Sequence, residues 1–248
     1  MTTYQTDGLT MGPVVDGNGA RSSTTSSRST VDRQVADQSN DNLYDTLLWR
    51  LRGRQAALQG SRALTVGLSG CKSRSGTTTI ATNLAVRASK ERDGRVLLIE
   101  ANWQTPRLQR LLRLPPGPGL AEVLAGSNAP QECIEQGPNE LLDVLPGGHF
   151  DQDRSARVCQ ENISALVELA QSQYGLVVVD LPPAESLRHT LLLAKALDGV
   201  LLVVRSEAAR QAQVQRVMSL FEQDGVPLWG AIMNRQPQYI PNWLRRWV

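Results

Sequence analysis

Short runs of apolar residues alternate along this chain with longer segments in which apolar residues recur every three or four positions. The apolar runs predict buried strands at 63–69, 95–101, 141–145, 176–181, 199–205 and 228–234. The longer segments predict helices at 77–92, 155–172 and 208–224. Regular alternation of strand and helix is typical of an α/β protein with a doubly wound, mostly parallel sheet flanked by helices.

The chain outside this repeating unit divides into three further segments. Leucines at helical spacing predict a helix at 41–60, with Gly60 as its end. Residues 1–40 are rich in Gly, Ser, Thr and Asp, so we expect a disordered, low-complexity tail. The α/β domain itself is expected at 61–236, and 237–248 forms a short C-terminal tail of aromatic and basic residues.

Composition excludes some classes of protein. A formal net charge of +2 over 248 residues is too small to demand a nucleic-acid partner. No apolar run approaches the ~20 residues that a membrane-spanning helix needs, and the N-terminus lacks the apolar region of a secretory signal. Three cysteines without metal-ligand spacing suit a reduced, cytoplasmic setting.

The segment GLSGCKSRSGTTT, at 67–79, lies where a phosphate-binding P-loop would connect the first strand to its helix. The expected spacing is G-x-x-x-x-G-K-[ST]. Cys71 holds the place of the first glycine, Gly76 that of the second, and Thr77 that of the lysine. Backbone amides of the loop and the positive end of the helix dipole favour phosphate. We therefore expect a nucleotide to be bound by Lys72, Ser73, Arg74, Ser75, Gly76, Thr77, Thr78 and Thr79.

Two further motifs supply polar groups at the ends of strands. Asp180 ends an apolar strand, where a carboxylate can hold Mg²⁺ together with the hydroxyl of Thr78. Glu100 lies near the end of the second strand and Asn102 follows that strand, and they complete the set of candidate catalytic residues with Asp180. The loops after the first, second and fourth of these strands share the edge of the sheet where ligands bind in such folds.

In this order and spacing, these elements resemble the MinD/ParA superfamily of P-loop ATPases, and more closely the bacterial tyrosine kinases (BY-kinases) of polysaccharide export. The resemblance covers about residues 41–235. Its matches are Asn83-Leu84-Ala85, Val96 to Ile99, Pro106, Gly119-Leu120, Val123 to Gly126, Leu145 to Gly148, Tyr174-Gly175, Asp180 to Pro183, Asp198 to Val204 and Met233 to Arg235. The resemblance implies ATP or ADP with Mg²⁺ as cofactors, a polysaccharide-export membrane protein as partner, and a location at the cytoplasmic face of the cell membrane.

Departures from the family pattern are concentrated at charged positions. Thr77 replaces the lysine, Glu100 the first aspartate of the second motif, and Asn102 its second aspartate. The oligomer-forming motif E-x-x-R-x-x-R of these kinases reads Asn42, Asp45 and Leu48, so self-association is left open. Because phosphoryl transfer relies on positioning and charge stabilisation, we expect a nucleotide-binding regulator, a pseudokinase with weak or no catalysis.

Two alternative functions remain open from the sequence. One is an active protein-tyrosine autokinase in which Lys72 or Arg74 replaces the missing lysine. The other is a MinD/ParA-type positioning ATPase, for which the aromatic and basic tail would contact the membrane.

Overall fold

The computed structural model describes residues 28–58, 62–91, 94–103, 105–149, 158–206 and 211–234; the side chains of residues 28–42, 188 and 189 lie outside this description. A seven-stranded sheet forms the centre, in the order β3-β4-β2-β5-β1-β6-β7. Its strands are β1 (Leu64–Gly70), β2 (Val96–Glu100), β3 (Glu135–Gln136), β4 (Leu142–Leu145), β5 (Leu176–Asp180), β6 (Gly199–Arg205) and β7 (Leu228–Asn234). All neighbours pair in parallel except β3 and β4. The predicted α/β fold is confirmed.

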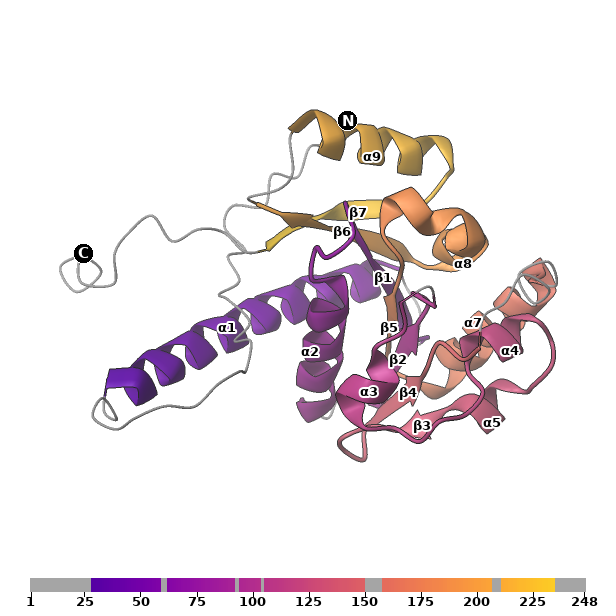
Figure 1. Ribbon diagram of the computed structural model, residues 1–248, viewed down its shortest axis with the longest axis horizontal. Coiled ribbons are helices and arrows are strands. Elements are labelled where there is room, and N and C mark those ends of the chain that lie inside the picture. The colour runs from indigo at the N-terminus through magenta and orange to yellow at the C-terminus, as the bar shows by residue number, and fades with distance from the viewer. Residues whose placement is uncertain are drawn as a thin grey trace.

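Helices cover both faces of the sheet (Figure 1). They are α1 (Arg28–Ala57), α2 (Thr77–Lys90), α3 (Leu108–Leu112), α4 (Leu120–Leu124), α5 (Pro130–Cys133), α7 (Gln160–Gln173), the 3₁₀-helix η1 (Ala184–Thr190), α8 (Leu191–Ala196) and α9 (Gln211–Gln223). Alternate strand residues point to opposite faces. Val178 accordingly packs with α1 and α2, whereas Val177 and Val179 pack with α7 and α8. Two hydrophobic cores therefore lie on either side of one sheet.

The N-terminal helix is longer than the sequence predicted. We expected it at 41–60 after a disordered tail, but α1 begins at Arg28. The polar composition of 28–40 suggested disorder, yet glycine and proline are absent between Arg28 and Arg52, so no residue there ends a helix. The rest of the predicted tail, residues 1–27, lies outside the described residues, and so does the C-terminal tail at 237–248.

The C-terminal half of α1 packs against α2 and the sheet of its own chain. Leu47, Leu48 and Leu51 are buried there. Asp45 accepts two hydrogen bonds from Arg87 of α2, at 2.5 and 2.8 Å. Two of the positions that align with the oligomer-forming motif, Asp45 and Leu48, thus make contacts within the chain.

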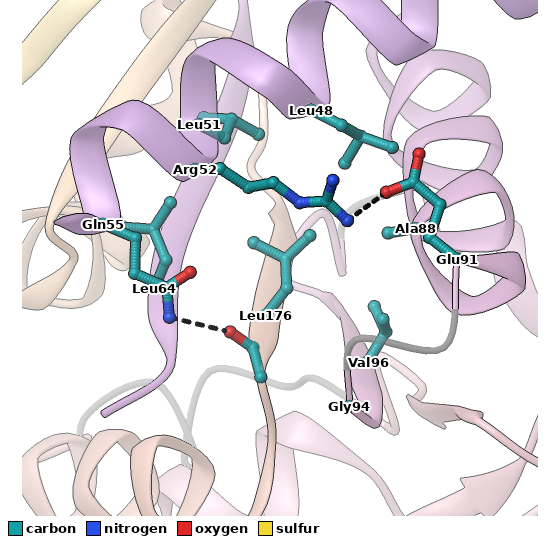
Figure 2. A pocket seen from close by; sticks show the side chains of 11 residues that line it. Leu48, Leu51, Arg52, Gln55, Leu64, Ala88, Glu91, Gly94, Val96 and Leu176 are labelled. Atoms are coloured by element: carbon teal, nitrogen blue, oxygen red, sulfur yellow. Dashed lines mark hydrogen bonds and ion pairs between the residues drawn. The ribbon is translucent and has the colours of Figure 1, made fainter. Parts of the chain in front are cut away.

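A small hollow lies where the C-terminal end of α1 meets the C-terminal end of α2 (Figure 2). Arg52 reaches across from α1 to pair with Glu91, next to the last residue of α2. Gln55 donates a hydrogen bond of 3.5 Å to the carbonyl of Gly175, which precedes β5. These polar contacts tie α1 to the amino ends of the strands. The opposite edge of the sheet, where the parallel strands end, is left for the loops that form the site.

Candidate functional site

The loop between β1 and α2 contains a glycine turn that several hydrogen bonds hold in place. Gly76 has φ +89°, and a Cβ atom there would collide with the side-chain amide of Asn234, so only glycine fits. That amide donates to the carbonyl of Ser75 at 2.8 Å. The Ser75 hydroxyl donates to the carbonyl of Lys72 at 2.7 Å, and the Cys71 amide to that of Val203 at 2.8 Å. Short side chains and β7 therefore hold the loop in place.

Thr77 is the first residue of α2, and its side chain lies at the base of the loop. A Cβ atom placed on Gly70 would be 2.9 Å from Thr77 Oγ1, which shows how close this hydroxyl is to the end of β1. A threonine carries no charge and is too short to extend along a phosphate chain as lysine does. The backbone amides at the N-terminus of α2 still favour an anion.

Thr78 and Asp180 lie together beneath the loop. Thr78 Oγ1 donates to Asp180 Oδ2 at 2.7 Å. Asp180 is fully buried, and burial raises the pKa of its carboxyl to about 7, against the opposing effect of the Thr78 hydrogen bond. Its Oδ1 atom has no hydrogen-bond partner among the described residues. A buried carboxylate oxygen without a partner, beside a hydroxyl, fits a Mg²⁺ ion.

Protein side chains alone would not enclose such an ion. No group of three His, Cys, Asp or Glu residues in the described part of the chain could hold a metal. Mg²⁺ ordinarily keeps several waters and takes one or two carboxylates plus phosphate oxygens. Thr78 and Asp180 match this coordination preference if a nucleotide supplies the phosphate oxygens.

Glu100 has a different set of contacts from those expected of a catalytic group. Its carboxylate accepts hydrogen bonds from the backbone amides of Arg107, Leu108 (2.9 Å) and Gly147 (3.2 Å). The side chain is buried and fastens the loops after β2 and β4 to the sheet. Its predicted catalytic role stays a prediction. Asn102, in contrast, lines the pocket and accepts a hydrogen bond of 3.3 Å from Thr105.

A pocket of about 620 Å³ opens above the P-loop at the carboxyl edge of the sheet. All eight residues predicted to bind nucleotide line it, together with Asn102. Residues that were not predicted as site residues complete the wall: Thr105, Arg107, Leu181, Pro183, Ser186 and Arg205. A signal for Arg205 was present, because it is the last residue of β6 and so lies at the ligand edge.

The fold is that of P-loop proteins of the MinD type. A solved MinD from Pyrococcus horikoshii, in complex with Mg-ADP, shares this fold with a TM-score of 0.60 and 21% identity over 74% of this chain and 76% of that chain. The kinase domain of the Escherichia coli tyrosine kinase ETK superposes with a TM-score of 0.71 and 25% identity, covering 82% of this chain and 80% of that one.

Sequence comparison indicates the same group. The chain is 28% identical over 167 residues, 67% of its length, to the tyrosine-protein kinase wzc of Salmonella typhi. Its homologues are thus bacterial tyrosine kinases, as the motifs indicated. The chain spans only 23% of the length of that relative. No protein-family model matches it. No helix in the described ranges is long and apolar enough to cross a membrane.

Proposed function

We propose that this chain is a BY-kinase-like P-loop protein that binds ATP or ADP with Mg²⁺ and acts as a regulator in exopolysaccharide or capsule export, with weak or no catalysis. The observation that carries the proposal is the position of Thr77. It stands where the lysine belongs, while the glycine turn, the Thr78 hydroxyl and the Asp180 carboxylate around it are retained. The site keeps the groups that hold a nucleotide and lacks one that stabilises charge during transfer.

Loss of the lysine affects chemistry more than binding. Backbone amides at the start of α2, Thr78 and Asp180 can still hold phosphate and Mg²⁺. Removing one preorganised donor to a developing charge typically slows an enzyme by about 10²–10³-fold. A carboxylate is lost as well, because Asn102 stands where the family pattern has an aspartate. Turnover should therefore be slow or absent while nucleotide binding persists.

Export of polysaccharide enters the proposal through the resemblance to the BY-kinases. The partner would be a polysaccharide-export membrane protein, and the chain would work at the cytoplasmic face of the cell membrane. Asp45 and Leu48 contact α2 and the sheet of their own chain. These contacts support a role different from that of a self-assembling kinase.

Calorimetric titration of the purified chain with MgATP, from micromolar to millimolar nucleotide, tests the proposal. We expect saturable binding that weakens when Mg²⁺ is removed. An assay for tyrosine phosphorylation should then show little or no product. ATP-dependent phosphorylation that disappears in Asp180→Ala would contradict the pseudokinase, and no binding at millimolar MgATP would contradict the nucleotide site itself.

An active autokinase is the second candidate, and one observation favours it. Lys72 and Arg74 are exposed and line the pocket, so each can present a positive charge to a phosphate. If Lys72 replaces the missing lysine, Lys72→Ala should abolish phosphorylation. Equal activity in Lys72→Ala and the unchanged chain would rule out that role.

A further inference from the structure

Positive charge surrounds the pocket from several elements. Four cationic side chains line it: Lys72, Arg74, Arg107 and Arg205. Among the described residues, no carboxylate lines the same pocket; Asp180 lies buried beneath it. Two of the four cations belong to the P-loop, whereas Arg107 and Arg205 come from elsewhere in the chain. The loop lacks the positive charge of a lysine at position 77, but two arginines outside the loop bring positive charge to the same pocket.

The order of strands places these two arginines on opposite sides of the P-loop. The strands run β2-β5-β1-β6 across this part of the sheet, and the P-loop follows β1. Arg107 follows β2, on one side, and Arg205 is the last residue of β6, on the other. Because the strands are parallel, both positions lie at the edge where the P-loop lies. The pocket therefore has an arginine on each flank.

The backbone holds Arg107 at this edge. Its amide donates a hydrogen bond to the buried carboxylate of Glu100, and the next amide, that of Leu108, does the same. The Arg107 side chain lines the same pocket as Thr78, which is hydrogen-bonded to the buried Asp180.

We propose that Arg107 and Arg205 form a clamp that holds the phosphate chain of a nucleoside triphosphate in place of the missing P-loop lysine. This inference rests on the proposed nucleotide site. A guanidinium stays charged at all relevant pH values and presents a planar fork of donors that matches phosphate. Two such groups on opposite flanks favour ligands with several phosphates. The affinity of the chain for a nucleotide should therefore depend more on the number of phosphates than on the base.

Calorimetric titration of the full chain and its variants with MgATP tests the clamp. Arg107→Ala removes the fork but keeps the backbone bond to Glu100, and Arg107→Lys keeps the charge without the fork. Arg110→Ala is the matched control, since Arg110 is an exposed arginine of α3 that does not line the pocket. Arg205→Ala tests the other flank. Circular dichroism of each variant checks that it is folded.

We expect Arg107→Ala to weaken MgATP binding roughly tenfold to a hundredfold, as for the loss of a charge-assisted hydrogen bond. Arg107→Lys should recover part of the loss, and Arg110→Ala should bind as the unchanged chain does. AMP should bind weakly and about equally to all variants. Inorganic tripolyphosphate should compete with MgATP on the unchanged chain and less well on Arg107→Ala.

The outcomes separate this inference from the proposed function. If the unchanged chain binds MgATP and both Arg107→Ala and Arg205→Ala bind it equally well, the clamp is wrong and the nucleotide site stands. If AMP binding falls as much as MgATP binding, the arginines do not act on the phosphate chain and the clamp is again wrong. If the unchanged chain binds no MgATP, the clamp and the proposed function are both overturned.

Discussion

At the scale of single residues, the site combines a buried carboxyl group with the absence of the P-loop lysine. Asp180 is fully buried, bonded to Thr78 on one oxygen and without a described partner on the other. An ionised carboxylate in such a place is costly unless a cation joins it. Thr77 removes the lysine that would supply one positive charge nearby. We therefore expect the protonation of Asp180 to respond to pH and to Mg²⁺ together.

We predict that Asp180 makes the metal-free protein less stable as pH rises. Burial raises the pKa of this carboxyl from 3.8 to about 7, so between these values the folded state holds a proton that the unfolded state releases. The free energy of unfolding should accordingly fall as pH rises from about 5 to 7. Urea unfolding at several pH values in EDTA would measure the slope.

Asp180→Asn provides the comparison for this slope. The amide cannot ionise, so the variant should lose this part of the pH dependence and become the more stable protein at pH 7.5. Adding Mg²⁺ with ATP should reduce the difference by stabilising the ionised carboxylate of the unchanged chain. Parallel pH profiles for the two proteins would show that Asp180 does not carry a raised pKa.

Restoring the lysine is the second prediction at this scale. Thr77→Lys should strengthen MgATP binding about tenfold or more and raise any ATP turnover by up to about 10²–10³-fold, because the loop around it is already shaped for phosphate. Titration calorimetry and a phosphate-release assay would measure both. Ser73→Lys adds the same charge to an exposed loop position and should have a smaller effect. Equal gains from both variants would mean that only net charge matters.

At the scale of elements, α1 is an integral part of the described structure. Its residues Leu47, Leu48 and Leu51 are buried in the same core as α2. Arg87 of α2 lowers the pKa of Asp45 through their hydrogen bonds. A helix whose apolar stripe is covered in this way is not available to a second copy along that stripe. The other side of α1 carries Trp49, which is 73% exposed.

Removing one of the buried leucines should therefore destabilise the whole chain. Leu48 is only 4% exposed, and Leu48→Ala should lower the free energy of unfolding by about 2–5 kcal/mol. The neighbouring Trp49→Ala should change it by less than about 0.5 kcal/mol, because that side chain lies in solvent. Urea unfolding of the two variants measures the difference. Equal losses would mean that α1 does not pack on α2 in solution.

At the scale of the whole molecule, the site is assembled from segments far apart in the chain. The P-loop, the loop after β2, Asp180 and the end of β6 meet because parallel strands end at one edge. Asn234 of β7 holds the P-loop through Ser75. Ligand binding at this edge should therefore stabilise the sheet as a unit.

We expect MgATP at a hundred times its dissociation constant to stabilise the folded chain by about 2.7 kcal/mol. For a domain of this size, that corresponds to a rise of roughly 5–10 °C in the midpoint of thermal unfolding. Differential scanning calorimetry would record it. Thr78→Val and Asp180→Ala should each reduce the rise, whereas Arg110→Ala should leave it unchanged. A similar rise in the variants would place the nucleotide elsewhere.

The sequence by itself determined the α/β class, the chain order of its main strands and helices, and most of the pocket wall. The spacing of apolar residues indicates which positions of a strand or helix are buried. The glycine turn, Thr78 and Asp180 could be predicted because each lies at or close to the end of a predicted strand. The start of α1 was missed, because composition describes how much apolar surface a segment can bury and not whether a polar helix can continue from a packed one.

Only the tertiary structure decided which polar groups meet. The catalytic role of Glu100 stays a prediction, and its position in the sequence did not reveal that three backbone amides from two loops donate to its carboxylate. Arg107 and Arg205 lie far apart in the chain and flank one pocket, because strand order in the sheet differs from strand order in the chain. Spacing along a sequence fixes contacts within one loop or helix, whereas contacts between loops depend on how the strands pair.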